Sequence, residues 1–86
     1  MVATGQTARQ YGEVFDTISI CLSKGLGAPV GSVLLGTAKD IKRALRIRKA
    51  MGGAWRQAGY IAAGGLYALE NHVERLAEDH AKAQAI

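Results

Sequence analysis

Lys24 is the residue of this 86-residue chain whose setting best suits covalent chemistry. It ends an apolar run and opens a short loop with glycines and a proline, in the stretch CLSKGLGAPVG at residues 21–31. An amine with little water around it stays neutral and nucleophilic more easily, as a lysine that forms a Schiff base requires. Gly25 and Gly27 carry no side chain, so a planar ligand could approach the backbone there. The spacing alone leaves open an ordinary solvated lysine at the end of a strand.

No other pattern predicts a binding or catalytic site. The glycine spacing of the loop does not fit G-x-G-x-x-G, the loop leads to a strand, and no GxxxxGK[ST] occurs. No cysteine or histidine cluster has the spacing of metal ligands, so we expect no metal. His80 falls on an apolar helical stripe and is predicted to be a core or interface histidine, whereas His72 is predicted at the surface. Cys21 is predicted to pack inertly within a strand.

The charge of the chain is concentrated in one segment. The formal net charge is +4, and seven of the 11 Lys and Arg residues lie between Lys39 and Arg56. Such a cluster is typical of nucleic-acid or anionic-membrane contacts, but this one lacks interleaved aromatic residues and shares its helix with an apolar face. A solvated helix face is favoured, with no nucleic-acid and no membrane partner. One cysteine, no leader pattern and no long apolar run favour a cytoplasmic protein.

The elements that position Lys24 are predicted from local patterns. Residues 14–22 are rich in β-branched and aromatic residues and predict a strand covered on both faces. SVLLG at 32–36 predicts a second strand, which should pair antiparallel with the first across the short loop. A helix should begin near Ala38, with Thr37 as its N-cap, and end before the paired glycines 52–53.

One long helix is predicted from Ala54 to about Ala83. A stripe of larger apolar residues, alternately four and three positions apart, is expected to form its core face; it comprises Ala62, Leu66, Leu69, Val73, Leu76 and His80. Gly64 and Gly65 are costly inside a helix, so they should mark a bend or a close approach of another backbone.

The stretch CLSKGLGAPVGSVLLG closely resembles the cofactor-lysine segment of the low-specificity L-threonine aldolases. These are pyridoxal-phosphate enzymes of the aspartate-aminotransferase-like fold (fold type I), grouped with the β-eliminating lyases. The resemblance covers roughly residues 12–83 and includes IKRALRIRKAMGG and the following RQ; Ala54-Trp55 replace the family's usual glycine and methionine before RQ. It implies an α/β fragment of the large cofactor-binding domain, residues 1–86 being strand, lysine loop, strand, helix and long helix rather than a complete domain.

The resemblance also implies roles for three residues. Lys24 would attach covalently to pyridoxal 5'-phosphate, and Arg56 and Lys49 would help hold the cofactor phosphate, reaching it from a neighbouring subunit of a homo-oligomer, expected to be a homotetramer. Family members are several times longer, and the residues that stack on the ring, pair with its nitrogen and bind the substrate carboxylate fall outside this chain. The chain alone is therefore expected to be inactive.

The implied reaction is cleavage of a β-hydroxy-α-amino acid, L-threonine or L-allo-threonine, to glycine and acetaldehyde. One alternative is a β-eliminating lyase of the same fold, because the groups that choose the substrate lie elsewhere. The other is a small basic helical interaction module without chemistry, which would have no use for a lysine between a strand and closely spaced glycines.

Overall fold

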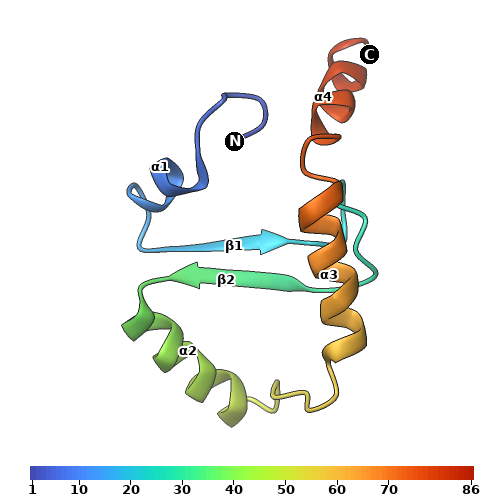
Figure 1. The fold of residues 1–86 in the computed structure, drawn as a ribbon. Helices are drawn as coiled ribbons and strands as arrows, with labels where there is room; N and C mark the ends of the chain where they lie inside the picture. Colours follow the sequence, from blue (N-terminus) through green and yellow to red (C-terminus); the bar gives the residue numbers. More distant parts are fainter.

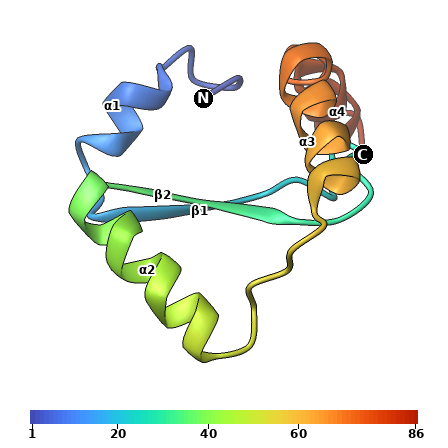
Figure 2. The same ribbon diagram turned by 60° about the horizontal axis from the view of Figure 1, so that its bottom comes forward.

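The computed structural model describes residues 1–86 as a two-stranded sheet with helices at both ends (Figure 1). The elements in chain order are α1 (Ala8–Gly12), β1 (Thr17–Cys21), β2 (Ser32–Gly36), α2 (Ala38–Ala50), α3 (Gly59–Asn71) and α4 (Leu76–Gln84). The predicted α/β class is confirmed. In Figure 2, α1 and α2 lie near one end of the strands, and α3 and α4 lie at the other end.

The two strands pair antiparallel, as predicted, with Thr17 opposite Gly36 and Cys21 opposite Ser32. The composition of the first strand predicts cover on both faces, which residues 1–86 do not themselves provide. Only Ile18 and Ile20 of β1 are half-buried, and every residue of β2 is exposed. The reason is that no element of the chain lies flat on either face, and cavities of about 490 and 460 Å3 remain there. Cys21 is consequently exposed and not packed as predicted.

Helix α2 begins and ends where the sequence predicts. The Thr37 hydroxyl accepts a hydrogen bond from the Asp40 amide at 3.2 Å and donates one to the Asp40 carboxylate at 2.6 Å, which caps the first turn. The chain leaves the helix through Gly52, whose φ of +81° favours glycine. The Gly53 amide then donates to the Arg48 carbonyl at 2.8 Å and closes the last turn.

The prediction of one helix from Ala54 to Ala83 is wrong in two respects. Helix α3 begins only at Gly59, and it ends at Asn71. Helix α4 begins after four intervening residues, which form a turn held by short-range bonds such as that from the Leu76 amide to the Val73 carbonyl at 3.2 Å. The break falls at His72, the C-cap of α3, whose ring bonds to a distant part of the chain.

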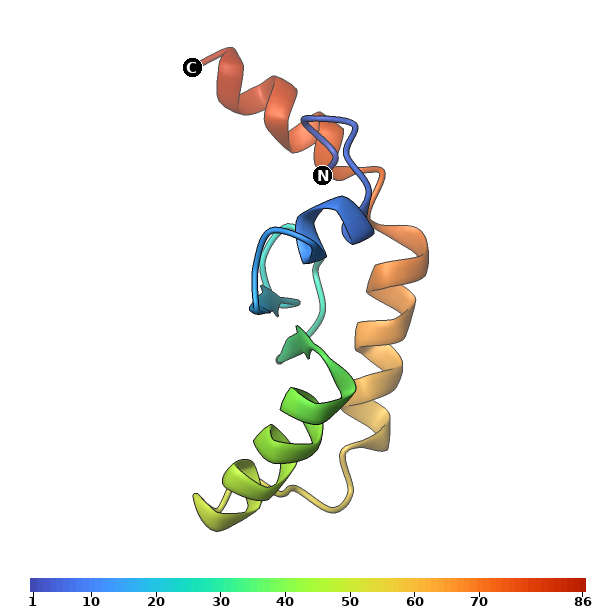
Figure 3. The same ribbon diagram turned by 90° about the vertical axis from the view of Figure 1, so that its left-hand side faces the viewer.

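The core of the chain is small and touches the sheet only through Ile20 at the end of β1. Only five of 86 residues are buried: Leu22, Leu26, Ala28, Gly65 and Ala68. Three come from the loop between the strands and two from α3, so the core is the contact between this loop and this helix. The radius of gyration is 14.9 Å, whereas a compact domain of this length has about 12 Å. Figure 3, which views the chain from another side, shows this open arrangement. None of the helices has the length and apolarity that crossing a bilayer requires.

Candidate functional site

The loop at residues 22–31, here called the lysine loop, is closed by its own backbone. The Gly27 amide donates to the Lys24 carbonyl at 2.8 Å, which makes a tight turn with Lys24 as its first residue. The Leu22 amide donates to the Gly31 carbonyl and the Ala28 amide to the Leu22 carbonyl, both at 3.0 Å. Gly27 has a φ of +72°, which an L side chain rarely adopts. The loop is therefore a defined structure and not a compliant linker.

Helix α3 packs against this loop through its smallest residues. A β-carbon on Gly64 would lie 3.0 Å from Pro29 Cδ, and one on Gly65 would lie 3.2 Å from Leu22 Cδ1. Ala68, one turn further on, is 1% exposed. Gly64 and Gly65 thus allow the loop to approach the helix closely, although the nearest loop atoms belong to side chains and not to the predicted backbone.

The start of α4 closes on the loop beside Lys24. A β-carbon on Gly25 would meet Leu76 Cδ2 at 2.7 Å and Asp79 Oδ2 at 3.1 Å. The interpretation that Gly25 leaves room for a planar ligand is wrong for this chain, because α4 fills that space. The glycine at this position instead allows the loop and the helix to pack.

Lys24 itself is exposed. The expected shielding of its amine from water is therefore not provided by residues 1–86. Its neighbours Leu22 and Leu26 are buried against α3 and α4, whereas its own side chain is left accessible. Lys24 therefore has an accessible amine, while the residues before and after it in the loop are fixed by packing.

His72 reaches the lysine loop from the end of α3. Its Nδ1 lies 2.6 Å from the Leu26 carbonyl oxygen, and the ring packs edge-on against Tyr67 with centroids 5.5 Å apart. It is the one side-chain hydrogen bond that joins residues more than ten positions apart. The prediction of a surface position for His72 is wrong, since His72 is half-buried and bonded. His80 is exposed and is therefore not a core histidine of this chain, whereas an interface position for it stays a prediction.

The face of α3 that is covered explains why His72 contacts the loop. The covered positions are Ile61, Gly65, Ala68 and His72, whereas Leu66 and Leu69 are 61% and 42% exposed. The predicted stripe of larger apolar residues lies one position later in the sequence than the stripe that is covered. The signal that could have found His72 was its spacing of seven from Gly65, because small residues mark the face of a close contact.

Lys49 and Arg56 lie far from Lys24 within the chain. Lys49 belongs to the last turn of α2 and Arg56 to the segment before α3, and both are exposed. The lysine loop reaches α4 beyond the opposite end of α3 (Figure 1). A helix of 13 residues is about 20 Å long. One chain therefore does not bring these cations to the lysine.

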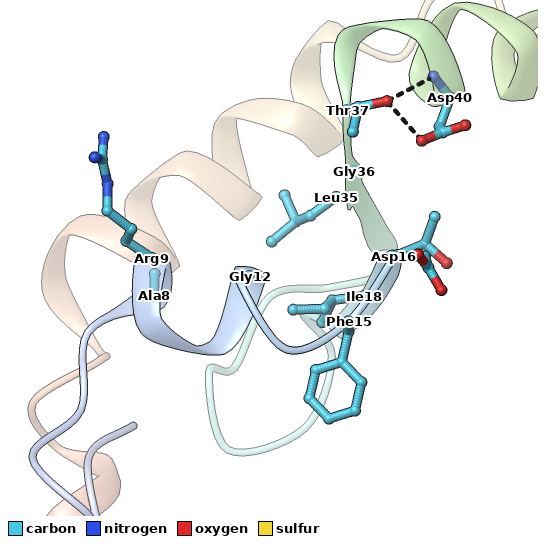
Figure 4. A pocket seen from close by; sticks show the side chains of 11 residues that line it. Ala8, Arg9, Gly12, Phe15, Asp16, Ile18, Leu35, Gly36, Thr37 and Asp40 are labelled. Carbon is cyan, nitrogen blue, oxygen red and sulfur yellow. Dashed lines mark hydrogen bonds between the residues drawn. The ribbon is translucent and has the colours of Figure 1, made fainter.

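A cavity of about 590 Å3 lies at the other end of the strands from the lysine loop (Figure 4). Its charged lining residues are Arg9, Asp16 and Asp40. Asp40 and Thr37 are bonded to each other as the cap of α2, and the Arg9 side chain points away from both carboxylates. This cavity has no converging reactive groups, which leaves the lysine loop as the candidate site.

Comparison with known proteins places the chain among lyases. A family model described as beta-eliminating lyase matches residues 1–86. The low specificity L-threonine aldolase of Escherichia coli O157:H7 is 54% identical over 80 residues, which are 93% of this chain and 24% of that protein. The probable low-specificity L-threonine aldolase 2 of Arabidopsis thaliana is 46% identical over 85 residues, 99% of this chain and 24% of that protein. The chain spans about a quarter of the length of the curated relatives it matches.

Proposed function

The chain belongs to the beta-eliminating lyase family, which has the aspartate-aminotransferase-like α/β fold, and on that premise we propose that it acts as the lysine-bearing segment of a pyridoxal-phosphate-dependent aldolase. The proposed reaction converts L-threonine or L-allo-threonine to glycine and acetaldehyde. The names of the relatives support the aldolase class. The observation that carries the proposal is the exposed Lys24 amine on a loop whose backbone is anchored by α3 and α4.

The residues of the chain fit the covalent anchor of such a cofactor. Lys24 Nζ would bind the cofactor aldehyde, while the closed turn from Lys24 to Gly27 keeps the lysine backbone in one place. When bound, pyridoxal phosphate supplies an electron sink for the bond broken at Cα. The contribution of this chain is the fixed position of the amine that holds it.

A phosphate contact by Arg56 and Lys49 is part of the same proposal. Because Arg56 precedes α3 and Lys49 lies on α2, whereas the residue after Lys24 packs against α4 beyond α3, they would reach the cofactor held by the Lys24 of a second subunit. Arginine suits phosphate because its planar guanidinium donates two parallel hydrogen bonds. The proposed site is therefore assembled from two copies.

The test uses a full-length enzyme that carries this segment. We define the exchange protein as the Escherichia coli O157:H7 relative with its matching segment replaced by residues 1–86. It should form glycine and acetaldehyde from L-threonine and show the visible absorption of bound cofactor. Lys24→Ala should abolish that absorption and lower turnover by several orders of magnitude, because the nucleophile is lost.

Lys42→Ala is the matched control, since Lys42 is also an exposed lysine but lies on α2, and it should retain both properties. A Lys24→Ala variant with normal absorption and activity would refute the proposal. The sister activity predicts different products, because β-elimination releases a 2-oxo acid and ammonia in place of glycine and an aldehyde. Product analysis thus separates the two lyase classes.

A further inference from the structure

We propose that His72 is a positioning residue for Lys24, acting by a hydrogen bond that fixes the peptide between Leu26 and Gly27. The Leu26 carbonyl can only accept a hydrogen bond, so the ring nitrogen at 2.6 Å must carry the proton. In the neutral ring this is the Nδ1–H tautomer, with Nε2 left as the acceptor. The part that concerns Lys24 chemistry rests on the proposed function; the hydrogen bond itself does not.

This peptide is held at both of its polar groups. Its N–H, from Gly27, donates to the Lys24 carbonyl at 2.8 Å, and its C=O, from Leu26, accepts from His72. A peptide that can rotate would break the turn of which Lys24 is the first residue. The positive φ of Gly27 makes such rotation easy, because glycine accepts several backbone conformations at low cost. The bond from His72 removes that freedom two residues from Lys24.

The His72 ring is also held in place by contacts other than its hydrogen bond to the loop. Tyr67, on the last turns of α3, packs edge-on against it at an interplanar angle of 85°. His72 is half-buried and directly follows the helix. A β-carbon on Gly27 would lie 3.5 Å from His72 Nδ1, so the ring fills the space beside that glycine. The contacts with Tyr67 and Gly27 thus hold the His72 ring where its Nδ1–H can donate to the Leu26 carbonyl.

Three variants of the exchange protein separate the donor from the bulk of the ring. His72→Leu keeps an apolar side chain without the donor. His72→Asn places an amide N–H on the atom that corresponds to Nδ1, so it should restore the bond. His80→Leu is the matched control, because His80 is exposed on α4 and makes no such bond.

The first measurement is amide hydrogen exchange, followed by mass spectrometry of the peptide that spans Lys24 to Gly31. His72→Leu should raise the exchange rate of this peptide on the order of tenfold, as expected for the loss of one hydrogen bond. His72→Asn and His80→Leu should exchange like the parent. Exchange in His72→Leu that equals the parent rate, or exchange in His72→Asn as fast as in His72→Leu, would overturn the proposal. If His72→Leu does not fold, the exchange rate of His72→Asn is compared with that of the parent. A rate on the order of tenfold above the parent then overturns the proposal.

The second measurement reports on Lys24. The amount of pyridoxal phosphate that borohydride traps on Lys24 should fall on the order of tenfold in His72→Leu and recover in His72→Asn. Binding of pyridoxine phosphate, which has no aldehyde and cannot attach to the amine, should not change. An equal loss of trapped pyridoxal phosphate and of bound pyridoxine phosphate would indicate that the whole site is disturbed, and would overturn the positioning role. If the parent itself traps no cofactor on Lys24, the proposed function fails, while hydrogen exchange still tests the bond.

Discussion

Gly25 and Leu76 approach so closely that a β-carbon on Gly25 would lie 2.7 Å from Leu76 Cδ2. Leu76 is part of the apolar cluster that surrounds Leu22 and Leu26, so it cannot turn away without losing contacts. The pair therefore fixes how near α4 can come to the residue after Lys24.

Gly25→Ala should destabilise the exchange protein by about 1–3 kcal/mol, because the added methyl group displaces Leu76 or the loop. Gly59→Ala is the control, since nothing lies within 4 Å of a β-carbon there and the position begins α3. That change should be neutral or stabilise by up to about 1 kcal/mol. Chemical denaturation measures both; equal stabilities for the two variants would show that α4 does not press on the loop.

Thr37→Ala should cost about 1 kcal/mol of unfolding free energy, because the first turn of α2 loses the bond between the Thr37 hydroxyl and the Asp40 amide. Thr37→Ser retains the hydroxyl and should remain within a few tenths of a kcal/mol of the parent. The comparison is made by chemical denaturation of the exchange protein. A Thr37→Ser variant as unstable as Thr37→Ala would rule out the cap as the cause.

Arg56→Ala should weaken cofactor affinity about ten- to a hundredfold, which corresponds to about 1.5–3 kcal/mol for one charge-assisted phosphate contact. Saturating pyridoxal phosphate should restore much of the rate, unlike in Lys24→Ala. Arg46→Ala, an exposed arginine on α2, is the control. Cofactor titration of the exchange protein measures the effect, and an unchanged affinity would remove Arg56 from the proposed site.

The 86-residue chain on its own should associate or behave as a loosely packed state. With five residues buried, and with side chains such as Trp55 and Tyr60 65% and 96% exposed, apolar burial does little more than balance the lost conformational entropy. Calorimetry combined with sedimentation tests this. A sharp two-state unfolding transition of a monomer would contradict it.

Much of the fold follows from signals that are local in the sequence. The antiparallel strands, the Thr37 cap and the end of α2 each depend on neighbouring residues, and each is confirmed. The hydrogen bond of His72 joins residues 46 positions apart, so the pattern within one helix can place His72 on the same face as Gly65 but cannot show what its ring contacts. The accessible Cys21 has the same kind of cause, because exposure depends on what else covers the strand.

Within the candidate site, residue type and spacing make Lys24 a candidate but leave an ordinary solvated lysine open, and only the family resemblance assigns it the cofactor. Neither explains the glycines around it. Gly25 and Gly27 look like room for a ligand when only their neighbours in sequence are considered. In the structure the Leu76 side chain occupies the space beside Gly25, and the His72 ring occupies the space beside Gly27. The roles of Arg56 and Lys49 remain predictions for a site shared between subunits.

The lysine loop packs against α3 and α4, which follow it in the sequence and are therefore synthesised after it on the ribosome. The loop leaves the ribosome well before its supports, since Asp79 follows Lys24 by about fifty residues, and at roughly 5–20 residues per second this interval lasts several seconds. During that time neither His72 nor Leu76 is available, and the turn at Lys24 has no outside support. Lys24 is therefore brought to its final geometry by residues translated after it, so a ribosome that stalls within α3 would expose a lysine that is chemically complete but not yet placed.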